Sequence, residues 1–207
     1  ANREIFWNTV KSDMDYMPSI SGYVTTKDCI SQEYPFENCI NSMKAFCSEI
    51  VVMDGGSTDG TYEKLLELAE IDERVKVYQH NVDWNASRFA VEDGLQKARA
   101  RAKCTGDFLW QIDSDEEVNQ NTVGEIIKLC RQFPKFVDIV CLPVMEYWGS
   151  DKKVRIDVNP WKWRLSRNKP NITHGIPKEL RLIDDDGNLY SAPGSDGCDY
   201  IDSETYE

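Results

Sequence analysis

Short apolar segments alternate with longer amphipathic segments along most of this chain of 207 residues. The apolar segments have the length of β-strands, whereas apolar residues in the segments between them recur at the three- and four-residue spacing of helices. Consecutive parallel strands need such a crossover, because the chain has to return to the end of the sheet where the previous strand began. We therefore expect an α/β domain with a mostly parallel sheet flanked by helices. The predicted strands cover residues 19–26, 49–54, 75–80, 107–112 and 137–144, and the predicted helices cover 35–46, 61–71, 87–104 and 123–133.

The pattern changes after Glu146, where short pieces rich in Trp, Asn, Pro and Gly are typical of hairpins rather than of strand–helix units. No repeat and no low-complexity linker separates these pieces from the residues before them. We expect a small antiparallel C-terminal extension of the same sheet, so that residues 1–207 form a single domain. Within the earlier part, Asp59 is predicted to be the N-cap of the helix that begins at Thr61.

Charge and cysteine content exclude some classes of protein. Lys and Arg total 24 against 36 acidic residues, and the resulting net charge of −12 argues against a nucleic-acid binder. The seven cysteines are odd in number and form no C-x-x-C pair, which favours buried free thiols in a reducing compartment. We find no run of roughly 20 apolar residues and no signal peptide before the first predicted strand. These features predict a cytoplasmic protein and leave open a peripheral association with a membrane.

Acidic residues follow two of the predicted strands directly. Asp54 ends "EIVVMD", and Asp113 and Asp115 follow "DFLWQI". Ligands of open α/β sheets bind beyond the carboxyl ends of the strands. Carboxylates that leave room for phosphate oxygens and water suit Mg²⁺ or Mn²⁺. A helix-capping acidic turn is the alternative interpretation of Asp113 and Asp115.

The stretch "DGGSTDGT" that begins at Asp54 has two interpretations as well. Its glycines expose backbone N–H groups at the start of a helix, which would suit a phosphate. It lacks the ending of a P-loop and the glycine spacing of a dinucleotide fold, so neither of those motifs is supported. A tight turn between strand and helix is the simpler alternative.

Three stretches in this order, "ISGYVTTKD", "EIVVMDGGSTDGT" and "TGDFLWQIDSDEE", resemble the nucleotide-sugar half of glycosyltransferase family 2, which has the GT-A fold. The resemblance covers roughly Ser19 to Val144. It implies a metal-dependent, inverting transfer of a sugar from a nucleoside diphosphate sugar to a saccharide or lipid-linked saccharide. Uridine is the nucleoside that the resemblance favours. Residues 19–145 would then form the nucleotide-sugar and metal half, and residues 146–207 the acceptor half.

The resemblance also implies roles for individual residues. Thr25, Thr26 and Asp54 would hold the base of the donor. Asp113 would lie near the ribose and the metal, and Asp115 would bind the metal, Mn²⁺ or Mg²⁺, on the diphosphate.

Basic residues and a histidine extend the predicted site. Members of the family often carry an arginine–asparagine pair about sixteen residues before the acidic motif, and this chain has Lys97 there instead. Lys97 and Arg101 are four residues apart on one predicted helix, so we expect both to meet phosphate. His174 lies in a segment that resembles a histidine-containing loop of some family members, where it would be a further metal ligand. A surface histidine is the alternative.

An inverting transfer needs a carboxylate that takes the proton of the acceptor hydroxyl. Glu179 is the first choice for this base and Asp196 the second, with Asp199 and Glu146 as weaker candidates. The tryptophans of the same half could stack on an acceptor sugar or pack in a small core. They are Trp148, Trp161 and Trp163.

Two other functions compete with the glycosyltransferase. A sugar nucleotidyltransferase would normally have a glycine-rich stretch with a basic residue after the first strand, and "TTKDCISQEYP" has no glycine. A non-catalytic domain that binds a nucleotide sugar would share the fold and lack the base, which the sequence alone does not distinguish from an enzyme.

Overall fold

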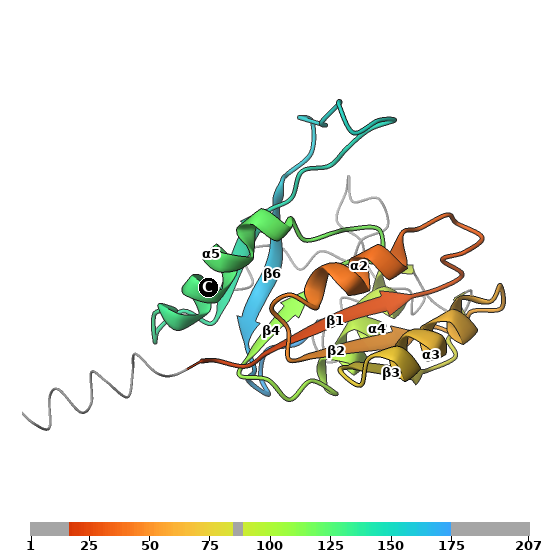
Figure 1. The fold of residues 1–207 in the computed structure, drawn as a ribbon, viewed down its shortest axis with the longest axis horizontal. Coiled ribbons are helices and arrows are strands. Elements are labelled where there is room, and N and C mark those ends of the chain that lie inside the picture. Colours follow the sequence, from red (N-terminus) through yellow and green to blue (C-terminus); the bar gives the residue numbers. More distant parts are fainter. Residues whose placement is uncertain (1–16, 85–88, 175–207) are drawn as a thin grey trace, which may run out of the picture.

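A computed structural model of the protein describes residues 17–84 and 89–174 (Figure 1). Within these residues the strands form one six-stranded sheet with the order β3-β2-β1-β4-β6-β5. Strands β1 to β4 are mutually parallel where they pair, and β6 runs antiparallel to both β4 and β5. The strands are β1 Ile20–Thr26, β2 Glu49–Asp54, β3 Val75–Gln79, β4 Phe108–Gln111, β5 Ile139–Pro143 and β6 Trp161–Arg167. The predicted α/β class with a mostly parallel sheet and an antiparallel extension is confirmed.

Helices cover both faces of the sheet. The helices are α2 Phe36–Met43, α3 Thr61–Ile71, α4 Phe89–Arg101 and α5 Val123–Arg131, with a short 3₁₀ turn, η1 Gln120–Thr122, before α5. Apolar residues of α2, α3 and α5 join the larger core cluster on one face. The C-terminal part of α4 packs with Tyr23, Val51 and Leu109 on the other face. A strand covered on both sides has to be apolar at consecutive positions, which is why β2 reads as an unbroken run.

The start of α3 differs from the prediction in one detail. Gly60, with φ of 97°, occupies the N-cap position, and no side chain of that residue caps the helix. Asp59 still contributes, because its carboxylate accepts the N–H of Thr61 at 3.0 Å and the hydroxyl of Thr61 at 2.6 Å. The predicted capping residue was therefore wrong by one position, since only glycine adopts this backbone conformation without strain.

The C-terminal extension is antiparallel as expected, but its last strand does not lie at the edge of the sheet. β6 is inserted between β4 and β5, and residues 144–160 form an arm that projects away from the sheet (Figure 1). A bridge between Tyr147 and Val154 pairs the two sides of this arm. Trp148 is 67% exposed there, with the guanidinium of Arg155 over its ring. The arm therefore leaves aromatic surface in contact with solvent.

Every described cysteine is a free thiol, which confirms that part of the prediction. Five are buried and one is exposed, and Cys198 lies outside the described residues. The buried thiols are Cys29, Cys39, Cys47, Cys104 and Cys130, and the exposed thiol is Cys141. Across residues 17–84 and 89–174, no helix is both long and apolar enough to cross a membrane.

Candidate functional site

The parallel strands bring the predicted acids to one edge of the sheet. β1 lies between β2 and β4, so the segments that follow these three strands are neighbours. Thr26 and Asp54 are directly opposite each other in the register, and the hydroxyl of Thr26 donates to the carboxylate of Asp54 at 3.1 Å. Asp113 follows β4 two residues after its end. The structure thus places the ends of the strands as the sequence predicted.

Asp54 is fully buried and is engaged by the protein itself. Besides the Thr26 hydroxyl, its carboxylate accepts the backbone N–H groups of Gly56 at 3.0 Å and Ser57 at 2.9 Å. It also accepts the Ser57 hydroxyl at 2.5 Å and the amide of Gln79 at 3.1 Å. Five donors share its two oxygens, so the carboxylate is fully engaged by the protein. Asp54 therefore fixes the loop after β2, and its contact with the base of a donor stays a prediction.

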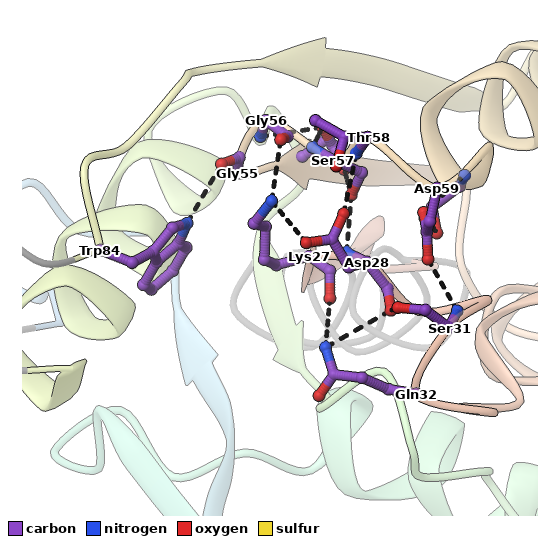
Figure 2. Close-up of polar contacts among 12 residues, drawn as sticks. Lys27, Asp28, Ser31, Gln32, Gly55, Gly56, Ser57, Thr58, Asp59 and Trp84 are labelled. Carbon is purple, nitrogen blue, oxygen red and sulfur yellow. Dashed lines mark hydrogen bonds and ion pairs between the residues drawn. The ribbon is translucent and has the colours of Figure 1, made fainter.

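The loop after β1 is tied to the loop after β2 (Figure 2). The ammonium of Lys27 lies 2.6 Å from the carboxylate of Asp28 and donates to the carbonyl of Gly56 at 2.9 Å. The N–H of Asp28 donates to the hydroxyl of Ser57, and its carboxylate accepts the N–H of Thr58, both at 2.8 Å. Asp28 adopts a left-handed φ of 47°, which costs about 1 kcal/mol for a residue with a side chain. These contacts hold both loops in one conformation.

Two cations compensate the acids that follow β4. The carboxylate of Asp113 accepts the ammonium of Lys97 at 2.8 Å, the amide of Gln111 at 2.9 Å and the guanidinium of Arg164 at 3.2 Å. Arg164 also donates to the carboxylate of Glu116 and to the carbonyl oxygen of the Gln111 side chain. The like charges of this turn are thus bridged by the protein's own cations before any ligand binds.

The ionisation of these groups follows from their neighbours. Burial opposes the charge of Asp113, but Lys97 and Arg164 outweigh it and lower the pKa of this carboxyl. Burial and the charge of Asp113 raise the pKa of Glu116. Burial would lower the pKa of Lys97, but Asp113 and Asp93, which lies 2.8 Å away, raise it. Lys97 therefore stays protonated and Asp113 ionised at neutral pH.

Asp115 differs from its neighbours in the turn. Its side chain is exposed, and it forms no hydrogen bond or ion pair with a described residue. Nowhere in the described residues do three His, Cys, Asp or Glu side chains gather closely enough to hold a metal ion. Mg²⁺ in phosphate-binding sites is usually held by one or two carboxylates together with substrate phosphates and water. A single free carboxylate at Asp115 fits a cation that binds together with a phosphate ligand.

His174 does not join Asp113 and Asp115 in a group of three ligands. Its Nε2 shares a hydrogen bond with the hydroxyl of Tyr23, and its ring stacks on Trp163 with the centroids 4.3 Å apart. Burial, with the charges of nearby basic residues, lowers the pKa of His174 to about 3. In the structure this imidazole is neutral and packs against aromatic side chains.

Arg101 and Lys97 meet different partners although they share a helix. Arg101 is buried, and its guanidinium donates to the carbonyls of Ile172 at 2.7 Å and Arg167 at 2.8 Å and to the hydroxyl of Ser166 at 2.7 Å. It therefore attaches α4 to β6 and to the segment after it. Of the two basic residues predicted to meet phosphate, only Lys97 reaches the acidic turn.

The remaining predicted residues form no hydrogen bond or ion pair with the acidic turn or lie outside the described residues. Thr25 is half-buried, and its side chain makes no hydrogen bond with a described residue. Glu146 pairs with Arg155 at 2.7 Å in the arm. The other predicted acids, Glu179, Asp196 and Asp199, lie outside the described residues.

Arg164 was not singled out from the sequence, although it lies in a stretch rich in arginine. It is only 6% exposed, an unusual burial for a charged residue, and it comes from a strand that pairs with β4. The alternation of residues along β6 indicates which side chains share a face, but not which strand lies beside them. The sequence therefore showed Arg164 as a basic residue between two apolar ones, but it did not indicate which acids Arg164 would contact.

Comparison with known proteins now defines the class of this protein. The sequence model of glycosyl transferase family 2 matches residues 32–186, three quarters of the chain. The chain therefore belongs to glycosyl transferase family 2. This membership confirms the predicted family and argues against the nucleotidyltransferase alternative.

Two curated relatives agree with the family. The SPbeta prophage-derived glycosyltransferase SunS of Bacillus subtilis is 25% identical over 149 residues, which cover 68% of this chain and 33% of SunS. An uncharacterized glycosyltransferase of Rickettsia typhi, RT0209, is 29% identical over 114 residues, which cover 53% of this chain and 32% of that protein. The chain thus spans about a third of the length of these relatives.

Solved structures show the same fold. S. aureus TarS superposes with a TM-score of 0.52 over 72% of this chain and 28% of TarS, at 20% identity. A structure of TarS residues 1–349 in complex with UDP gives a TM-score of 0.53 over 72% of this chain and 47% of that one, also at 20% identity. At this identity the likeness concerns the fold, and it confirms the predicted GT-A architecture.

Proposed function

We propose that this chain is a domain of a metal-dependent, inverting glycosyltransferase that uses a nucleoside diphosphate sugar. The observation that carries the proposal is the compensated acidic turn after β4. Lys97 and Arg164 neutralise Asp113, whereas Asp115 is exposed and pairs with none of the described residues. Such a turn suits a ligand that carries both a cation and phosphates. The UDP bound by TarS, which shares the fold, supports uridine as the first base to test.

Asp115 and Asp113 would bind different parts of the donor. Asp115 would hold Mg²⁺ or Mn²⁺, which when bound would neutralise the charge of the leaving diphosphate. Asp113, whose charge is already balanced, would accept hydrogen bonds from the ribose. The fixed loops would place the base, so that the donor enters a site that needs little rearrangement.

The acceptor side rests on residues 146–207. A carboxylate there would take the proton of the acceptor hydroxyl as the sugar is displaced with inversion. Glu179 remains the first candidate and Asp196 the second. A saccharide or lipid-linked saccharide is the acceptor class that we propose.

Calorimetric titration of UDP and GDP, each with and without Mn²⁺, tests the donor site. We expect UDP binding that depends on Mn²⁺ and weakens at least tenfold in Asp115→Asn. Glu117→Gln is the matched control, because Glu117 is an exposed acid two residues away whose carboxylate accepts the amide of Asn38 at 3.0 Å. Equal binding of UDP by the wild type and Asp115→Asn, or binding that ignores Mn²⁺, would contradict the proposal.

A further inference from the structure

Trp84 packs on the glycine that follows β2. Its indole N–H donates to the carbonyl of Gly55 at 3.2 Å. A β-carbon placed on Gly55 would lie 2.7 Å from Cζ2 of Trp84, closer than any real side chain tolerates. The six-membered part of the indole therefore occupies the space that a side chain of residue 55 would need. Gly55 is required here so that the indole can reach the main chain.

The main chain under Trp84 is held firmly from several sides. The N–H of Gly55 donates to the carbonyl of Thr26 at 2.8 Å, and the next carbonyl, that of Gly56, accepts the ammonium of Lys27. Figure 2 shows the Trp84 indole and the Lys27 side chain contacting these neighbouring carbonyls. The indole is thus anchored to the two loops that Asp54 and Asp28 hold in place.

The end of β2 offers aromatic surface and no free carboxylate. Trp84 is half-buried, and the ring of Phe89, which is 70% exposed, lies 5.6 Å from it between centroids. The carboxylate of Asp54 is engaged by donors of the protein itself, and position 55 has no side chain. A ligand group that binds at this place meets a flat indole and a phenyl ring.

The spacing between the ends of β2 and β4 indicates which part of the donor would reach Trp84. Neighbouring strands are about 4.8 Å apart, so the ends of β2 and β4 are separated by about 10 Å with β1 between them. A nucleoside diphosphate whose diphosphate lies at Asp115 and whose ribose crosses the end of β1 brings its base to the end of β2. Planar bases stack on aromatic side chains irrespective of their hydrogen-bonding edges.

We propose that Trp84 forms the wall on which the base of the donor stacks, and that it determines how tightly the nucleoside is held. This inference rests on the proposed function, because it places the diphosphate at Asp115. It adds an indole to the base contacts that the sequence analysis assigned to Thr25, Thr26 and Asp54. Gly55 then has a function as well, since a larger residue would displace the indole from the loop.

The test compares UDP with inorganic pyrophosphate, both titrated calorimetrically in the presence of Mn²⁺. Trp84→Leu should weaken UDP binding about tenfold, as expected for the loss of one base–aromatic stack, and leave pyrophosphate binding unchanged. Trp84→Phe should regain most of the affinity for UDP, because it keeps a planar ring. Trp148→Leu in the arm is the control and should change neither.

The outcomes separate this inference from the proposal on which it rests. If wild-type protein binds neither UDP nor pyrophosphate, the proposed function fails. If UDP binds the wild type and Trp84→Leu equally well, the inference is overturned and the proposed function stands. If Trp84→Leu loses pyrophosphate as well as UDP, Trp84 only supports the loops, and the inference is overturned too.

Discussion

The Arg164→Met substitution leaves the acids after β4 with a single cation. In the wild type the guanidinium of Arg164, on a side chain that is 7% exposed, bridges Asp113 and Glu116. Methionine keeps the volume of the side chain but removes the charge and all its donors. Asp113 retains Lys97, whereas Glu116 loses its ion pair and faces Asp113 without compensation.

The expected cost follows from the exposure of the partners. Removing one partner of a fully buried ion pair costs about 3–5 kcal/mol, because a buried charge is left without compensation. Asp113 is 37% exposed and Glu116 20% exposed, so water screens part of this penalty. We therefore expect the free energy of unfolding to fall by about 2 kcal/mol. With a urea slope of about 2 kcal/mol per molar, the midpoint should fall by about 1 M.

Urea unfolding followed by tryptophan fluorescence measures this change. Glu116→Gln should lower the stability of the wild type but raise that of Arg164→Met, because in the second background it removes the uncompensated acid. The matched control is Arg155→Met, whose ion pairs with Glu146 and Asp157 lie in the exposed arm, and we expect it to stay within about 0.5 kcal/mol. A loss below about 0.5 kcal/mol for Arg164→Met, or additive effects with Glu116→Gln, would refute the bridging role.

Two further predictions concern Glu49 and His174. Burial opposes the charge of Glu49, but hydrogen bonds from Lys76, Ser21 and Thr105 outweigh it and lower its pKa from 4.5 to about 2. The resulting stabilisation, on the order of 3 kcal/mol, is complete above pH 4.5 and is lost as the pH falls toward 2. The free energies of unfolding of wild type and Glu49→Gln, measured in urea, should therefore differ at pH 7 and converge near pH 2. A constant difference between the two proteins across this pH range would contradict the prediction. His174→Gln should keep Mn²⁺-dependent UDP binding within about twofold, because the imidazole faces Tyr23; a tenfold loss would restore its predicted role as a metal ligand.

The parallel core could be predicted from the sequence because its strands carry their own signal. β2 is apolar at consecutive positions because helices cover both of its faces, and the loop after it contains two glycines with positive φ, Gly56 and Gly60. Such local requirements are visible in a short window of sequence. The carboxyl ends of the strands, and with them the place of Asp113 and Asp115, followed from the class of the fold.

The partners of individual side chains could not be predicted, since they depend on contacts between distant residues. Residues four apart on a helix share a face, yet Lys97 meets the acidic turn and Arg101 meets β6, because the two turns of α4 lie over different parts of the sheet. The place of Asp54 at the end of a strand predicted its contact with a base, which stays a prediction, but not the hydrogen bonds of its carboxylate. Its oxygens accept the N–H groups of a loop in which Gly56 has a φ of 87°.

The position of β6 between β4 and β5 also has a consequence for folding while the chain is being synthesised. Arg164 is 51 residues beyond Asp113 in the chain, so at about 5–20 residues per second it leaves the ribosome roughly 3–10 s later. During this interval β4 is an unpaired edge of the growing sheet, a state that favours pairing with other chains. The acids that follow β4, which have not yet met Arg164, would then repel other copies of this acidic chain. The same charges that prepare a donor site in the finished protein would thus protect the nascent sheet from aggregation.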